Sequence, residues 1–213
     1  MPSFNAAEPP VPSEIALAAL IPQAEHLVLS QLRPHFICNV LNIIYYMIGR
    51  EPETARNMLD DFSAYLRNNL DCLNSRVPVA LEKEISHVHL YIRFEQLRFR
   101  ERLQVEYDLA DNDFALPPLT LQPLVENAVR HGVCPLDEGG CVRIESVKED
   151  GCHVVRIRDN GVGFDPSQCA RAPSLGTIRA RVEEMCGGSL SIFSVPGKGT
   201  VAEIRVPEKK MSV

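Results

Sequence analysis

A short segment with the sequence LTLQPLVENAVRHG, from Leu119 to Gly132, carries polar side chains at a spacing that could serve chemistry. If the segment is helical, Asn127 and His131 lie one turn apart and share a face. The amide oxygen of Asn127 could bind Mg²⁺, because this ion prefers oxygen ligands and keeps several of its waters. His131 on the same face could approach a phosphate. The alternative is an amphipathic helix with a proline near its start and one polar edge.

A second segment, RDNGVGF, places a carboxylate at the end of a predicted strand and just before two glycines. Asp159 could accept a hydrogen bond from an exocyclic amine, while Gly161 and Gly163 would let the backbone approach a flat ring closely. An ordinary Asp-Asn-Gly turn is the alternative. A glycine-rich turn that contains Gly199 and Thr200 follows near the C-terminus, and alone it indicates only a hairpin.

Taken together and in this order, the motifs ENxxxH and DNGxG and the glycine-rich hairpin resemble the N and G1 boxes of the GHKL ATP-binding fold. Histidine kinases share this fold with gyrase-type ATPases, Hsp90 and MutL proteins. The resemblance implies an α/β sandwich in which helices and one face of a mixed sheet enclose ATP, with Mg²⁺ on Asn127. The nucleotide-binding residues that it implies are Asn127, Arg130, His131, Asp159, Gly161, Gly163, Gly176, Thr177, Gly199 and Thr200.

The segment QLRPHFICNVLN resembles the phosphoacceptor segment of the LytS/YehU-like sensor histidine kinases, in which the histidine is autophosphorylated. Similar stretches extend this resemblance over residues 28–207. It implies that His35 accepts the phosphoryl group through a neutral ring nitrogen. Asn39, one helical turn further on, could hydrogen-bond the ring or the phosphoryl group. Without the resemblance, His35 would be read as a capped polar residue beside a kink at Pro34.

Two positions depart from related proteins. GHKL ATPases place a water-activating glutamate four residues before the box asparagine, where this chain has Pro123. Other kinase families have an acidic residue directly after the phosphorylated histidine, where this chain has Phe36. Glu126 is the remaining nearby acid, and the resemblance assigns it a part in phosphoryl transfer. A hydrolase is therefore disfavoured, and most of the rate should come from positioning and from charge stabilisation by Mg²⁺.

The second glycine box of the family, GxGLxN, is degenerate here, because the aligned stretch reads APSLGT. This box wraps phosphates with backbone N–H groups at a helix N-terminus. Gly176 and Thr177 remain as candidates for that role, and Ser174 or Thr177 could cap the helix. The departure leaves an alternative function open, namely a dimeric signalling or docking module that binds nucleotide poorly.

The composition is that of a folded globular protein, with 45% hydrophobic and 23% charged residues in a chain of 213. Collagen, a coiled-coil rod and wholesale disorder are excluded. The net charge of −6 argues against a broad nucleic-acid surface. No apolar run is long enough for a transmembrane helix. The seven cysteines are scattered and include no CxxC pair, which favours reduced thiols in a cytosolic protein over a disulfide framework or a zinc site.

The hydrophobic pattern predicts helices first and an α+β unit second. The predicted helices span residues 15–20, 23–48, 52–70, 81–100, 117–131 and 179–185. The predicted strands span residues 103–109, 142–147, 153–158, 190–195 and 200–206. We therefore expect a linker or disordered segment at 1–13, a helical dimerisation and phosphoacceptor region at 14–101, and a GHKL ATP-binding domain at 102–208.

The resemblance also implies partners. Autophosphorylation of His35 would be followed by transfer to an aspartate on a response regulator, in this family usually of the LytTR type. A homodimer is expected, because the apolar stripes of the early helices need a partner. No nucleic acid is expected, and a membrane would be reached only through a sensor region or partner outside this chain. The chain itself is expected in the cytoplasm.

Overall fold

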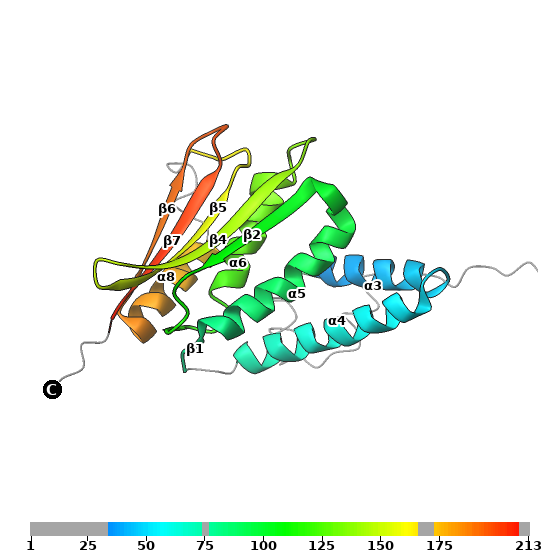
Figure 1. Cartoon of the computed structure of the whole chain (residues 1–213), viewed down its shortest axis with the longest axis horizontal. Coiled ribbons are helices and arrows are strands. Elements are labelled where there is room, and N and C mark those ends of the chain that lie inside the picture. Colours follow the sequence, from blue (N-terminus) through cyan, green and yellow to red (C-terminus); the bar gives the residue numbers. More distant parts are fainter. Residues whose placement is uncertain (1–33, 74–76, 166–172, 209–213) are drawn as a thin grey trace, which may run out of the picture.

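A computed structural model describes residues 34–73, 77–165 and 173–208 of the chain. The linker predicted at 1–13 and the helical residues predicted before Pro34 lie outside these ranges. The same holds for residues 166–172, which include most of the stretch between the two glycine boxes. Element labels below are those of Figure 1.

Three long helices form the first half of the described chain: α3 (Pro34–Ile48), α4 (Pro52–Leu73) and α5 (Leu81–Phe99). α3 and α4 each begin with proline, which is favourable at a first helical position because no backbone donor is needed there. The apolar stripe predicted for the second of these helices is only partly buried. Ala55 and Phe62 lie in the core, whereas Leu59 and Leu70 are exposed. In Figure 1, α5 lies between the α3–α4 pair and the remainder of the molecule.

The second half is built on a five-stranded sheet in the order β2-β4-β5-β7-β6. β2 pairs in parallel with β4, whereas the other three pairs are antiparallel, so the predicted mixed sheet of an α+β fold is confirmed. A separate two-stranded sheet, β1 with β3, was not predicted, because strands of two residues carry no detectable alternation. The strand bounds are β1 Val79–Ala80, β2 Leu103–Leu109, β3 Ala115–Leu116, β4 Gly140–Glu149, β5 Cys152–Asp159, β6 Ser189–Ser194 and β7 Thr200–Pro207.

The large sheet has one apolar face and one charged face, as expected when only one side is covered by helices. Ile144 and Ile157, opposite each other on β4 and β5, are buried beneath the helices. On the other face Arg156 donates to Glu203 over 2.7 Å and also bonds Glu149. Such cross-strand charge pairs fix the strand register on the exposed side.

Helices α6 (Leu121–Asn127) and α8 (Pro173–Cys186), with the π-helical turn η2 (Ala128–Val133), cover the apolar face. The prediction of a regular helix over 117–131 was wrong at both ends. It begins only at Leu121, because Leu119 has a positive φ of 55°, and its last turn widens into η2. The prediction of 179–185 was too short, since α8 begins at Pro173.

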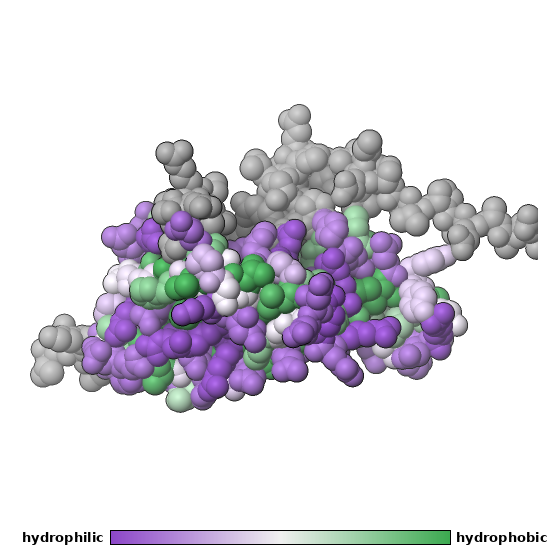
Figure 2. Space-filling model, turned by 90° about the horizontal axis from the view of Figure 1, so that it is seen from above, coloured by the Kyte–Doolittle hydropathy of each residue, from purple (hydrophilic) through white to green (hydrophobic). Residues whose placement is uncertain are grey.

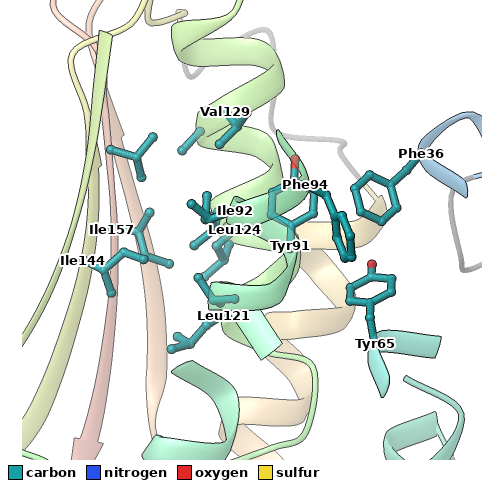
Figure 3. Close-up of a cluster of buried hydrophobic side chains, with 14 of the residues drawn as sticks. Phe36, Tyr65, Tyr91, Ile92, Phe94, Leu121, Leu124, Val129, Ile144 and Ile157 are labelled. Atoms are coloured by element: carbon teal, nitrogen blue, oxygen red, sulfur yellow. The ribbon is translucent and has the colours of Figure 1, made fainter. Parts of the chain in front are cut away.

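One continuous hydrophobic core runs from the large sheet, through α6 and α5, to the α3–α4 pair. Figure 3 shows it passing from Ile144 and Ile157 of the sheet, across α6 and α5, to the aromatic rings of α3 and α4. The ring of Phe36 lies 5.3 Å from that of Tyr65 and 5.3 Å from that of Tyr91. The helical region and the sheet are therefore packed through α5 as one body.

No helix within the described ranges is long and apolar enough to cross a membrane. In the view of Figure 2 the surface is largely hydrophilic, with separate apolar patches.

Candidate nucleotide and phosphoacceptor site

Six of the ten predicted nucleotide residues meet around a cavity of about 640 Å³ between the sheet and the helical elements α6, η2 and α8. Its polar wall comes from α6 and η2, its floor from β5 and β7, and Leu175 contributes from α8. A cavity of this size accommodates a small-molecule ligand. The predicted residues that line it are Asn127, Arg130, His131, Asp159, Gly163 and Thr200.

The polar wall depends on the π-helical turn. Asn127 closes α6, and Arg130 and His131 follow within η2, so that all three side chains line the cavity. A π-helical turn is wider than an α-turn and is often found at functional sites. The sequence spacing predicted a shared face for Asn127 and His131, but it gave no sign of the widened turn.

Asp159 lies at the end of β5 on the cavity floor and is only 8% exposed. Its carboxylate accepts a hydrogen bond of 2.9 Å from the backbone N–H of Gly161. Burial raises the pKa of Asp159 above its usual value, and backbone hydrogen bonds from Gly161 and Thr200 partly oppose this rise. A buried carboxylate that faces a cavity can accept a hydrogen bond from a ligand donor such as an exocyclic amine.

The glycines of this region serve close packing of the backbone around Asp159. A Cβ on Gly132 would lie 2.6 Å from Asp159 Oδ1, and one on Gly161 would lie 2.1 Å from the Gly132 carbonyl carbon. Gly199, with φ 82°, abuts the Asp159 carbonyl oxygen. Gly161 and Gly199 do not line the cavity, whereas Gly163 does. Gly161 was expected to let the backbone approach a flat ring. In the structure it instead allows close packing against the backbone of Gly132.

Gly176 and Thr177 lie apart from the cavity wall. Both are exposed residues within α8, and a Cβ on Gly176 would meet nothing within 4 Å. Because α8 begins at Pro173, Thr177 is inside the helix, so the expectation that Thr177 caps it was wrong. Within the described part of α8, Leu175 is the residue that reaches the cavity.

The phosphoacceptor candidate lies at a second, smaller opening, which we call the His35 crevice. It is lined by residues of α3, α5, α6 and η2: His35, Phe36, Asn39, Tyr91, Glu95, Arg98, Glu126 and Arg130. Nδ2 of Asn39 lies 3.1 Å from Nδ1 of His35. Rotating the amide exchanges its oxygen and nitrogen, so Asn39 can hold either ring tautomer.

Two residues tie the crevice to the nucleotide cavity. Glu126 and Asn127 are consecutive, yet Glu126 lines the crevice and Asn127 lines the cavity. Glu126 Oε1 accepts a hydrogen bond of 3.0 Å from Gln122, which also donates to the Tyr65 hydroxyl over 2.6 Å. Arg130 lines both openings, so its guanidinium group can serve an anion on either side.

Three residues of α5 that lie at the candidate site or support it were not singled out from the sequence. Glu84 accepts the backbone N–H groups of Leu119, Thr120 and Leu121 at 2.7, 2.8 and 2.9 Å, and so caps α6. Glu95 and Arg98 line the His35 crevice. A signal for the two acids existed, because both fall on the apolar stripe that contains Val88 and are buried in the structure. A charged residue on a buried stripe requires a polar partner.

The residues at the cavity fit a Mg²⁺–nucleotide complex. The described residues include no group of three or more His, Cys, Asp or Glu side chains able to hold a metal alone. Mg²⁺ bound to a nucleotide needs little from the protein, since phosphates and waters supply most of its ligands. The amide oxygen of Asn127 on the cavity wall is the candidate ligand.

Comparisons with known proteins cover both halves of the chain. Residues 25–103 match the histidine kinase family model, and residues 117–210 match that of the histidine kinase-, DNA gyrase B- and HSP90-like ATPases. The chain is 37% identical over 168 residues to the sensor histidine kinase YpdA of Escherichia coli, covering 78% of this chain and 28% of that protein. It is 30% identical over 168 residues to the sensor protein LytS of Oceanobacillus iheyensis, again covering 78% and 28%.

A further curated relative and one solved structure are also similar to this chain. An uncharacterized protein of Bacillus subtilis, YwpD, is 37% identical over 181 residues, which cover 80% of this chain and 65% of that protein. The chain therefore spans less than two thirds of each of these relatives. Among solved structures, the blue-light activated histidine kinase EL346 of Erythrobacter litoralis matches with a TM-score of 0.51 and 14% identity, over 90% of this chain and 62% of that one. This likeness concerns the fold.

Proposed function

Because the chain belongs to the LytS-like sensor histidine kinases, we propose that it binds ATP and phosphorylates its own His35. It then passes the phosphoryl group to an aspartate on a response regulator. One observation carries the proposal: Arg130 lines both the nucleotide cavity and the His35 crevice. A γ-phosphate leaving the cavity therefore meets the acceptor histidine beside a cation that both openings share.

The nucleotide residues divide the work of binding ATP. Asp159 on the cavity floor would accept a hydrogen bond from the exocyclic amine of adenine. Asn127, Arg130 and His131, which line the same cavity, would face the phosphates. A bound Mg²⁺, with Asn127 as its protein ligand, would supply charge neutralisation for the phosphates. Gly161 and Gly199 act indirectly, by allowing the tight backbone packing that holds Asp159 in place. Thr200, the first residue of β7, pairs with Asp159 across the sheet and donates its backbone N–H to the Asp159 carboxylate.

Transfer to His35 needs an unprotonated ring nitrogen. Its lone pair forms the N–P bond, the bond from Pγ to the bridging oxygen breaks, and ADP leaves with that electron pair. The side-chain amide of Asn39 faces Nδ1 of His35. With this amide rotated so that its oxygen accepts from Nδ1–H, Asn39 would hold the tautomer whose other nitrogen is free to attack. Glu126, which lines the crevice, is the nearby carboxylate for the proton that the phosphorylated ring must lose.

The proposal also includes the binding partners of the chain and its location in the cell. Exposed apolar side chains on α3, among them Leu41, Tyr45 and Ile48, recur at helical spacing and support a homodimer through this region. We keep 14–101 as the dimerisation and phosphoacceptor region and 102–208 as the ATP-binding domain. A LytTR-type regulator and a cytoplasmic location for the chain complete the proposal.

Labelling with ATP that is radioactive in its γ-phosphate tests the function. The wild-type chain, incubated with this ATP and Mg²⁺, should acquire label that is stable to alkali and labile to acid, as expected for a phosphohistidine. Substitution His35→Gln should abolish the label, while His89→Gln, on an unrelated face of α5, should retain it. A folded wild-type protein that binds ATP but takes up no label contradicts the kinase proposal.

A further inference from the structure

Glu95 is a buried acid that the mechanism above does not use. It lies on α5, is only 4% exposed and lines the His35 crevice. Its Oε2 atom is buried and has no hydrogen-bond partner among the described residues. Burial raises the pKa of this carboxyl, Glu126 adds to the rise, and Arg98 and Arg130 oppose it. An unsatisfied buried carboxylate is costly, so its retention beside the acceptor histidine calls for a function.

Arg98 is the cation nearest to this free oxygen. Its Nη1 atom lies 3.8 Å from Glu95 Oε2, which is within ion-pair distance but too long for a hydrogen bond. Its guanidinium group also lies 4.6 Å from the ring centroid of Phe99, and its side chain is 40% exposed. Arg98 is thus held from two sides while it remains accessible to a ligand in the crevice.

The two arginines of the crevice differ in what they can reach. Arg130 lines both the nucleotide cavity and the crevice, whereas Arg98 lines only the crevice. A γ-phosphate still attached to bound ADP can meet Arg130 in the cavity. It comes within reach of Arg98 only as it moves toward His35. An interaction made only during transfer lowers the barrier without strengthening substrate binding.

We propose that Arg98 stabilises the phosphoryl group during its transfer to His35, and that Glu95 positions Arg98 for this task. The inference rests on the proposed kinase function and adds two residues to it. The attacking nitrogen gains the Pγ bond as ADP departs, and negative charge spreads over the three outer oxygens of the group. A guanidinium donor aimed at these oxygens offsets that charge. Glu95, which acts through Arg98, is a positioning residue.

Single-turnover labelling of the full chain at saturating ATP, together with ATP affinity by calorimetry, tests the assignment. Arg98→Gln should lower the labelling rate about 100-fold with ATP affinity unchanged. Glu95→Gln should lower it about tenfold, again with unchanged affinity. Arg93→Gln, which changes another exposed arginine of α5 that pairs with Asp61 at 2.6 Å, should label at the wild-type rate. Unchanged ATP affinity also verifies that each variant is folded.

The double variant distinguishes positioning from a structural role. If Glu95 acts through Arg98, then Glu95→Gln combined with Arg98→Gln should label no more slowly than Arg98→Gln alone. Full additivity of the two losses would overturn the positioning role, and wild-type labelling by Arg98→Gln would overturn the assignment of Arg98. A variant with weakened ATP binding contradicts a role confined to transfer. Absence of label on the wild type would instead count against the proposed function itself.

Discussion

At the scale of single residues, Asp159 shows how its surroundings define its chemistry. It is a buried carboxylate at a strand end, and three glycines allow the backbone to close around it. Burial raises its pKa above the usual 3.8. The ionised form is the better acceptor for an exocyclic amine, so protonation should weaken ATP binding.

Substitution Asp159→Asn should therefore reduce ATP affinity at least tenfold, about the loss expected for a hydrogen bond to a charged group. In the wild type, affinity should fall as the pH is lowered through the raised pKa of Asp159, and this fall should be absent in the variant. Isothermal titration calorimetry across the acidic pH range measures both effects. Asp108→Asn, an exposed change on the charged face of the sheet, is the matched control. Equal affinities for wild type and Asp159→Asn would remove Asp159 from the site.

At the scale of elements, a side chain of α5 caps the N-terminus of α6 and so fixes where this helix begins. Glu84 on α5 receives three backbone N–H groups from the start of α6, all within 2.9 Å. These N–H groups have no acceptor within their own helix, so the Glu84 carboxylate satisfies them. Its negative charge also interacts favourably with the positive end of the helix dipole. The cap fixes the start of α6, whose last residue is Asn127, and η2 with Arg130 follows directly.

Substitution Glu84→Ala should lower the free energy of unfolding by about 3 kcal/mol, because it leaves buried donors without an acceptor. Glu84→Gln, which keeps one acceptor oxygen, should cost about half as much. Urea denaturation followed by circular dichroism measures both, with the exposed Glu82→Ala as control. A loss for Glu84→Ala that is no larger than that for Glu82→Ala would contradict the capping role.

Helix and strand positions followed from periodicity, whereas contacts between elements did not. The stripes of α4 and the alternation of β2 were visible because each concerns neighbours in the sequence. The π-helical turn was not visible, and its Gly132 packs closely against Asp159, a residue that is distant in the chain. For the same reason His35 was identified by its motif, while its neighbours Glu95 and Arg98 come from another helix and only the packing brings them there.

At the scale of the whole molecule, the core joins α3, which carries the proposed acceptor His35, to the elements that line the proposed nucleotide cavity of the same chain. Phe36, directly after His35, packs with its ring 5.3 Å from Tyr91 and 6.1 Å from Phe94 of α5. α5 in turn packs against α6, which carries Glu126. This aromatic contact holds His35 beside Arg130 of its own subunit, even if a second subunit binds through α3. The packing therefore favours transfer within one chain.

Subunit mixing tests this arrangement. His35→Gln lacks the acceptor, and Asp159→Asn binds ATP at least tenfold more weakly. At an ATP concentration too low to fill the weakened cavity, neither variant should therefore label alone. When the two are combined under conditions that exchange subunits, transfer within one chain predicts that mixed dimers also remain unlabelled, because no subunit has both a working cavity and an acceptor. Differently tagged variants purified through both tags verify that mixed dimers form before labelled ATP is added. Label on the Asp159→Asn subunit of such dimers would show that His35 reaches the partner's nucleotide instead, and the contact between Phe36 and α5 would then have to open during each catalytic cycle.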